Sequence, residues 1–206
     1  MIELFVSAFV TFFVVIDPPG CAPIFASLTA GAAPAHRRAM AIRSVGIASG
    51  ILLFFALFGE DLLRSLGVSL AAFRIAGGIM LFLIALEMVF EKRQERRSSR
   101  AEDVKRDGEV GDISVFPMGI PMIAGPGSIA SVMLLMARSD GLFQSLVVLG
   151  ALLATLLLTL AALLAAGPLM RLMGHRMEAM ITRILGVVLA ALAAQFVIDG
   201  IERSFS

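Results

Sequence analysis

Residues 14–25 read VVIDPPGCAPIF and place one aspartate, three prolines and a glycine inside an apolar run that extends from Ile2 to Ala30. A helix that crosses a membrane loses backbone hydrogen bonds at such prolines, and the hydrocarbon contains no water to replace them. Irregular backbone at that depth is tolerated where it is buried in protein or lines a wet cavity. We therefore expect residues 14–25 to mark a functional site.

The composition is that of an integral membrane protein. Of the 206 residues, 59% are hydrophobic and 16% are charged, which disfavours a soluble globular chain. Six runs reach the length of about 20 apolar residues that a transmembrane helix needs. They cover roughly residues 2–30, 40–59, 67–90, 113–137, 142–167 and 178–200. The first run is interpreted as a retained span rather than a signal peptide, because Glu3 stands where a basic n-region belongs.

The charged residues predict the domain organisation and the orientation of the spans. Residues 91–112 carry seven basic and seven acidic residues, and we interpret them as a solvated linker, for which disorder is one reading. This linker separates a first three-helix repeat, residues 1–90, from a second, residues 113–206. Thirteen of the 17 Lys and Arg residues follow the first, third and fifth spans. Because basic loops favour the cytoplasm, these loops and the linker are predicted to be cytoplasmic and both termini periplasmic.

A second interrupted helix is predicted in the fourth span, where residues 116–132 read FPMGIPMIAGPGSIASV. Residues 19–21 align with residues 126–128 at an offset of 107, and Arg74 aligns with Arg183 at an offset of 109. Two matches at nearly the same offset indicate that one half of the chain is a duplicate of the other. The alternative is that common residues such as Gly, Ala and Leu match by chance. Three spans in each half would place the second half upside down, as in the inverted repeats of secondary transporters. The predicted fold is all-α, with six transmembrane helices in two inverted three-helix repeats, the first and fourth helices being broken near the midplane.

The two breaks are expected to form one substrate site near the membrane midplane. Each break should present free N–H groups at the positive end of a half-helix, which favours an anion such as a carboxylate. Small residues at both breaks predict a pocket too tight for a bulky side chain. The candidate substrate-binding residues are Asp17, Pro18, Gly20, Cys21 and Pro23 in the first break and Pro121, Gly125, Pro126, Gly127 and Ser128 in the second.

Asp17 is the acidic residue that lies deepest in a predicted span, and two interpretations of it stay open. It can cap the half-helix that begins at Pro18, or it can be the partner of a coupling proton or a substrate ammonium group, and one residue can do both. Ala124 aligns with Asp17 in the second repeat, so coupling by this carboxylate would be asymmetric. Glu87, about one turn from a helix end, is interpreted as snorkelling to the membrane interface.

Three other classes of function are weighed against a transporter. An intramembrane enzyme needs a nucleophile with its base, an aspartate pair or metal ligands, and the spans offer none of these. We therefore expect no enzymatic activity, no catalytic residue, no cofactor and no metal, and nothing suggests a nucleic-acid partner. A channel or facilitator for another small solute and a regulatory membrane protein are the alternatives. A regulatory protein would not require breaks in both halves.

The two motifs DPPGCAPIF and PMGIPMIAGPGSI, residues 17–25 and 117–129, together resemble the paired signatures of the MarC family of bacterial inner-membrane proteins. This family includes the SnatA amino-acid transporters, and the resemblance extends over all six spans. It implies two inverted three-helix repeats, a place near the LysE-type transporters, and proton-coupled transport of small neutral amino acids such as glycine or alanine. The Pro19 and Cys21 positions look variable in the family, which argues against a direct role for the Cys21 thiol.

Overall fold

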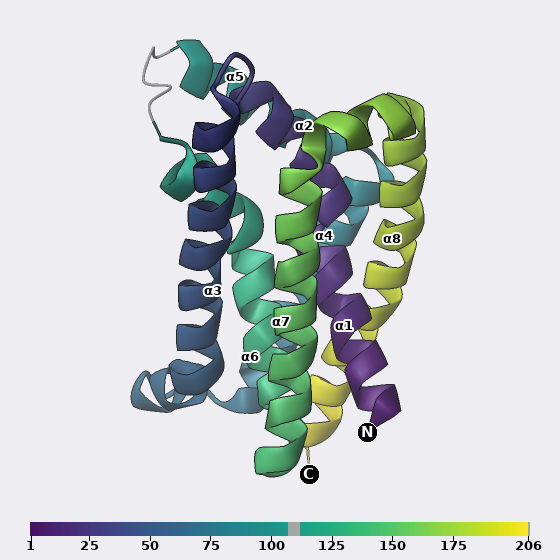
Figure 1. Ribbon diagram of the computed structural model, residues 1–206. Coiled ribbons are helices and arrows are strands. Elements are labelled where there is room, and N and C mark those ends of the chain that lie inside the picture. The colour runs from purple at the N-terminus through teal and green to yellow at the C-terminus, as the bar shows by residue number, and fades with distance from the viewer. Residues whose placement is uncertain (107–111, 206) are drawn as a thin grey trace.

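The structure is a computed structural model that describes residues 1–106 and 112–205. Within these ranges the chain is helical apart from short connections, and no strand occurs. The helices form a bundle in which both termini lie at one end and the charged helix α5 (Lys92–Arg106) lies at the other (Figure 1). The prediction of an all-α membrane protein is therefore confirmed.

Each predicted span corresponds to one long helix or to two shorter ones in series. The first three spans are α1 (Ile2–Ile16) with α2 (Pro18–Leu28), then α3 (Pro34–Ser65) and α4 (Leu70–Val89). The last three are η1 (Ser114–Ile123), which has π-helical turns, with α6 (Pro126–Met136), then α7 (Leu142–Leu164) and α8 (Ala166–Ser204). Five segments of the described chain are long and apolar enough to cross a membrane, and the bent pair of η1 and α6 is a candidate sixth.

Local sequence explains where several helices begin. Pro34 occupies the first turn of α3, where its missing N–H leaves no intrahelical bond unmade. Ser69 caps α4, because its Oγ accepts a hydrogen bond from the N–H of Ala72 at 3.1 Å. Gly67, with φ of 70°, forms the turn between α3 and α4 in a conformation that glycine adopts without steric cost.

Helices α4 and α8 cross at close range through glycines. A Cβ atom on Gly78 would lie 2.9 Å from the carbonyl oxygen of Ala193, and one on Gly200 would lie 3.0 Å from that of Ala71. In lipid, helices associate through such close backbone approach, because no hydrophobic effect draws them together. This contact joins the third span to the sixth.

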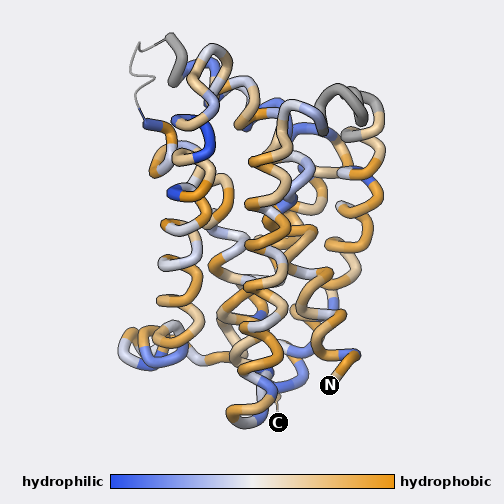
Figure 2. Tube along the Cα trace, viewed as in Figure 1, coloured by the Kyte–Doolittle hydropathy of each residue, from blue (hydrophilic) through white to orange (hydrophobic). Residues whose placement is uncertain are grey.

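Hydrophobic residues predominate along the length of the bundle, while hydrophilic residues gather at its two ends (Figure 2). The side chains of Phe54, Leu57 and Phe58 on α3 and of Leu153 and Leu157 on α7 are each more than 50% exposed. In water such continuous apolar surface would drive association, whereas hydrocarbon accommodates it. The long axis of the bundle is therefore the axis expected to cross the membrane.

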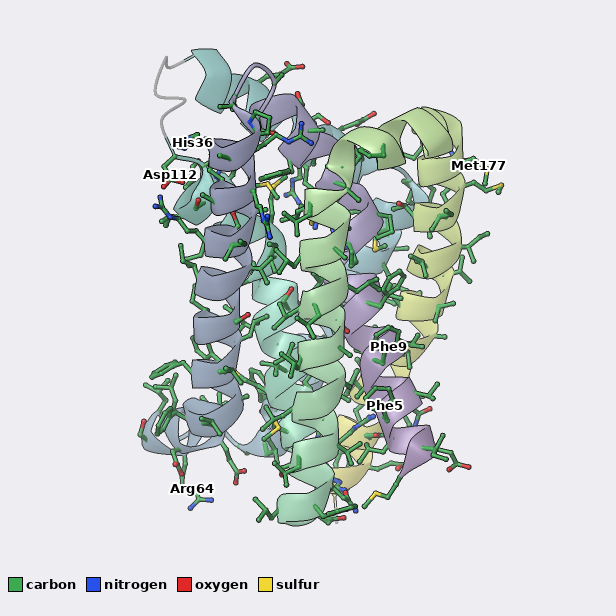
Figure 3. All side chains as sticks on the ribbon, in the orientation of Figure 1. Phe5, Phe9, His36, Arg64, Asp112 and Met177 are labelled. Carbon is green, nitrogen blue, oxygen red and sulfur yellow. The ribbon has the colours of Figure 1, made fainter. Side chains whose placement is uncertain are left out.

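The loops lie at the two ends of the bundle in the arrangement that the distribution of basic residues predicts. His36 and Asp112 lie toward the α5 end, and Arg64 lies at the end that holds the termini (Figure 3). The connections that follow α2 and α7 also lie at the α5 end (Figure 1). The three loops that carry most of the basic residues therefore share one end.

Asp112 anchors the chain where it re-enters the bundle. Its Oδ1 accepts from the N–H of Ser114 and its Oδ2 from Arg43 Nη1, both at 2.9 Å. The hydrogen bonds from Ser114, together with Arg43, hold the pKa of Asp112 below its usual range. The second half of the chain therefore begins at the α5 end.

We predict that Gly78→Leu destabilises the bundle by about 1–3 kcal/mol, because overpacking at a close backbone contact forces helices apart. Gly50→Leu is the matched control, since Gly50 lies on an exposed face of α3 with nothing within 4 Å of an added Cβ. Chemical denaturation of the purified protein in detergent micelles, followed by its helical signal, measures both effects. Equal destabilisation by the two substitutions would contradict the close contact of α4 with α8.

Candidate functional site at two helix interruptions

The first interruption is a single residue, Asp17, between α1 and α2. Asp17 adopts a left-handed backbone conformation, with φ of 59° and ψ of 65°, which Asp tolerates better than most residues. Its Oδ1 accepts a hydrogen bond from the N–H of Gly20 at 3.1 Å, and its carbonyl oxygen accepts from the N–H of Cys21 at 3.0 Å. These contacts confirm the interpretation of Asp17 as the cap of the second half-helix.

The first turn of α2 therefore keeps no N–H group for a ligand, since Pro18 and Pro19 have none. The expectation of free N–H groups at this break is wrong. The physical reason is that the Asp17 carboxylate already supplies the negative charge that a helix start attracts. Gly20 is needed beside it, because a Cβ there would lie 2.2 Å from Asp17 Oδ2.

The second interruption is wider and has no capping side chain. The axes of η1 and α6 differ by 52° across Ala124 and Gly125. Phe116 and Ile120 leave the helical region within η1, because each precedes a proline. Helix α6 begins at Pro126 with Gly125 as its N-cap, and among the described residues its first amides have no side-chain cap. The positive end of α6 is therefore available to an anion.

Arg97 of α5 connects the two interruptions. Its Nη1 lies 2.9 Å from Asp17 Oδ2, and both side chains are buried, with 8% and 1% exposure. Its Nη2 lies 3.5 Å from the carbonyl oxygen of Ile16 and 3.4 Å from that of Met122. Carbonyl groups at the end of a helix lack intrahelical partners and need hydrogen-bond donors from elsewhere. One guanidinium therefore satisfies acceptors from both halves of the chain.

Arg93, one turn earlier on α5, supports the same region. Its Nη2 donates to the carbonyl oxygen of Val15, and its Nη1 lies 3.0 Å from Met88 Sδ. Burial, and then the neighbouring charge of Arg97, lower the pKa of Arg93 to about 10. The Arg93 side chain therefore stays protonated at neutral pH.

Helix α5 adds to the interpretation of residues 91–112 as a solvated linker, because part of this segment is helical and packs on α2 and α4. Its described part is helical and inserts Arg97 between the interruptions, while residues 107–111 lie outside the described residues. A signal was present in the sequence: the arginines at positions 93, 96, 97 and 100 share one face of a helix. Periodicity could not show where that face points, because a helix that is polar all round normally faces solvent.

A cavity of about 810 Å³ opens beside the second interruption. The predicted residues of that break all line it, namely Pro121, Gly125, Pro126, Gly127 and Ser128. This cavity is larger than the small pocket that the sequence predicts. Side chains of α4 and α5 supply much of its lining, so the small residues form only part of it.

The residues of the first break do not line this cavity. Asp17, Pro18, Gly20 and Cys21 are buried, and Asp17 is connected to the cavity through Arg97, which lines it. Pro23 lines a separate cavity of about 430 Å³ between α2 and α5. The structure thus brings the second break and the α5 arginines together around this cavity, while the residues of the first break stay outside its lining.

The cavity carries an excess of positive charge. Among the described residues, the lining includes one carboxylate, Glu87, and four arginines, namely Arg93, Arg96, Arg97 and Arg100. Glu87 pairs with Arg96, and its side chain is 30% exposed. Within the described residues, Arg93 and Arg100 form no ion pair. Such a field favours a ligand with a negative group near the start of α6. Where side chains are described, no cluster of three His, Cys, Asp or Glu could hold a metal ion.

The fold and the site define a class, an all-α integral membrane protein with a charged cavity at an interrupted helix. Residues 2–205 match the family described as MarC family integral membrane protein, and the chain belongs to this family. The resemblance noted in the sequence is therefore confirmed at the level of the family. No solved structure matches the chain.

Relatives occur in both archaea and bacteria. A UPF0056 membrane protein of Methanocaldococcus jannaschii is 36% identical over 201 residues, which cover 98% of this chain and 97% of the relative. The UPF0056 membrane protein YvbG of Bacillus subtilis is 33% identical, with 100% and 97% of the two chains covered. The UPF0056 inner membrane protein YhgN of Escherichia coli is 34% identical, with 96% and 95% covered. These names specify no substrate.

We predict that Asp17→Asn lowers the free energy of unfolding by about 3–5 kcal/mol, because Asn keeps the cap but leaves Arg97 buried without a counter-charge. The double variant Asp17→Asn with Arg97→Gln should recover at least half of this loss, since both charges are then absent. Unfolding of the two single variants and the double variant in detergent measures their coupling. Strictly additive losses would contradict a buried ion pair at this position.

Proposed function

We propose that this protein is a secondary transporter of small neutral amino acids, of the glycine and alanine class, that is coupled to protons and works by alternating access. The observation that carries the proposal is the cavity at the second interruption, where an uncapped helix start meets small residues and a field of arginines. Arginines would attract a substrate carboxylate into the cavity, and the first amides of α6 would bind it.

The packing of the helices supports two inverted three-helix repeats around this site. The first span (α1 and α2) packs on the fifth (α7), just as the fourth (η1 and α6) packs on the second (α3). The third and sixth spans, α4 and α8, pack on each other, and the two interrupted spans meet through α1 and α6. Exchanging the halves maps the first two of these contacts onto each other and each of the last two onto itself, as a pseudo-two-fold axis in the membrane plane requires.

The aligned arginines agree with the same axis. Arg74, near the start of α4, donates to the carbonyl oxygen of Ala137 at 2.9 Å. Arg183, its equivalent on α8, pairs with Glu91 at 2.7 Å at the α5 end of the bundle. The two arginines thus lie toward opposite ends of the bundle, as equivalent residues do in an inverted repeat.

The two charged groups of an amino acid match the two interruptions. The carboxylate would lie at the amides of Gly127 and Ser128, and the ammonium group would need acceptors such as Asp17 Oδ2 and the carbonyl oxygen of Ile16. Space beside Gly127 is small, since a Cβ there would lie 2.5 Å from Ile84 Cδ1. We therefore place the size selection at this part of the cavity rather than along its whole lining.

Asp17 is the proposed coupling group. It is a buried carboxylate at an interruption, and its counter-charge is the buried Arg97. Protonation of Asp17 would remove its negative charge and so cancel its attraction to Arg97. The contact through which Arg97 connects the two interruptions would then change. Because Ala124 holds the equivalent position, coupling would belong to one repeat only.

The proposed topology places the α5 end in the cytoplasm and both termini in the periplasm, because the basic loops share the α5 end. The proposed location is a bacterial inner membrane, following the Escherichia coli relative that is described as an inner membrane protein.

Purified protein in liposomes is expected to take up labelled glycine and alanine saturably, and faster under an imposed proton gradient. Gly127→Leu should abolish uptake, because the new side chain fills the space against Ile84. Gly46→Leu on α3 is the matched control, with nothing within 4 Å of an added Cβ. Asp17→Asn should still exchange labelled glycine but lose its stimulation by the gradient.

Two results would change the proposal. Uptake that neither saturates nor responds to the gradient would indicate a channel or facilitator. An absence of uptake across a panel of small amino acids, with the protein shown to be folded by its helical signal and by size-exclusion chromatography, would overturn the transporter.

A further inference from the structure

Helix α5 is held on the bundle largely by polar contacts. Among the residues of α5 whose side chains are described, Arg97 and Ala101 are the buried ones, with whole-residue exposures of 7% and 4%. The remaining described side chains of α5 are half-buried or exposed. A segment with so little buried apolar surface separates from its neighbours more easily than a spanning helix does.

The acceptors that Arg97 occupies form a cation site to which both halves of the chain contribute. They are Asp17 Oδ2 and the carbonyl oxygen of Ile16 from the first interruption and the carbonyl oxygen of Met122 from the second. Carboxylate and carbonyl oxygens accept hydrogen bonds from an ammonium group as they do from a guanidinium group. The guanidinium of the chain itself therefore fills the position that a substrate ammonium group would need.

We propose that α5 is an autoinhibitory lid and that Arg97 is a tethered competitor, which a solute with a primary ammonium group displaces in order to reach both interruptions. The identity of the solute rests on the proposed function, whereas the lid is a property of α5 that can be tested without transport. Exchange is feasible because the incoming cation meets the same acceptors, so no buried charge is left unpaired when Arg97 leaves.

Cys21, the single cysteine of the chain, reports the position of the lid. Its side chain is fully buried, and its Sγ lies 3.5 Å from the carbonyl oxygen of Ile16, which Arg97 also contacts. Gln94 of α5 lies over the same turn, with its Nε2 3.5 Å from the carbonyl oxygen of Gly20. Movement of α5 away from the interruptions should therefore expose the thiol.

The first test is the rate at which a water-soluble maleimide labels Cys21 in the purified protein, followed by intact-protein mass spectrometry. We expect Arg97→Gln to raise the rate about tenfold, because the closed position of the lid loses its central contact. Lys92→Gln is the matched control, since it removes a positive charge from an exposed position of the same helix, and its rate should stay within about twofold of the wild type.

A further variant separates release of the lid from damage by an unpaired Asp17. The double variant Asp17→Asn with Arg97→Gln leaves no buried charge, and it should label Cys21 as fast as Arg97→Gln alone. Equal labelling rates in the wild type, in both Arg97 variants and in Lys92→Gln would overturn the lid.

Transport kinetics then test the lid and the proposed substrate as separate proposals. In liposomes, Arg97→Gln should lower the KM for glycine about fivefold or more, because a tethered competitor acts at high effective concentration. Faster labelling without uptake of any amino acid would support the lid and reject the proposed substrate. Uptake by the wild type with no change in labelling rate or KM in Arg97→Gln would support transport and reject the lid.

Discussion

The centre of this bundle depends on the buried ion pair between Asp17 and Arg97. A helix interrupted inside an apolar environment leaves donors and acceptors that no solvent can satisfy. The Asp17 carboxylate satisfies the donors at the start of α2, but an isolated carboxylate is itself costly to bury. Arg97 offsets that cost and, with the same guanidinium, reaches the carbonyl oxygens of Ile16 and Met122. The cap, the left-handed backbone of Asp17 and the placement of α5 therefore depend on one another.

The two interruptions solve the same problem in different ways, and the difference matters for the site. The first is closed by its own carboxylate and by an arginine from α5, so its residues are buried away from the cavity. The second has Ala124 where Asp17 would align and Gly125 at the N-cap, so its helix start is not capped by a side chain. The two interruptions are thus chemically unlike, since one is closed by an ion pair and the other is open to an anion.

Membership of the MarC family defines the kind of protein, while its chemistry has to be argued from the site. The α5 arginines line the cavity at the second break, and Arg97 also holds the first break. A single short helix from the segment between the two halves therefore contacts both breaks at once.

Much of the architecture was determined by the sequence alone, because it follows from local physics. Apolar runs of sufficient length define the spans, Pro34, Ser69 and Pro126 mark helix starts, and Asp17 before Pro18 is a recognisable cap. The tertiary structure alone decided that α5 folds back onto the interruptions, that Arg97 reaches Asp17 across 80 positions of the chain, and that the cavity is wide. Periodicity shows that four arginines share a helix face, but it carries no information about which surface that face meets. That choice was made by unsatisfied carbonyl and carboxylate oxygens from distant segments, which come together only when the bundle is assembled.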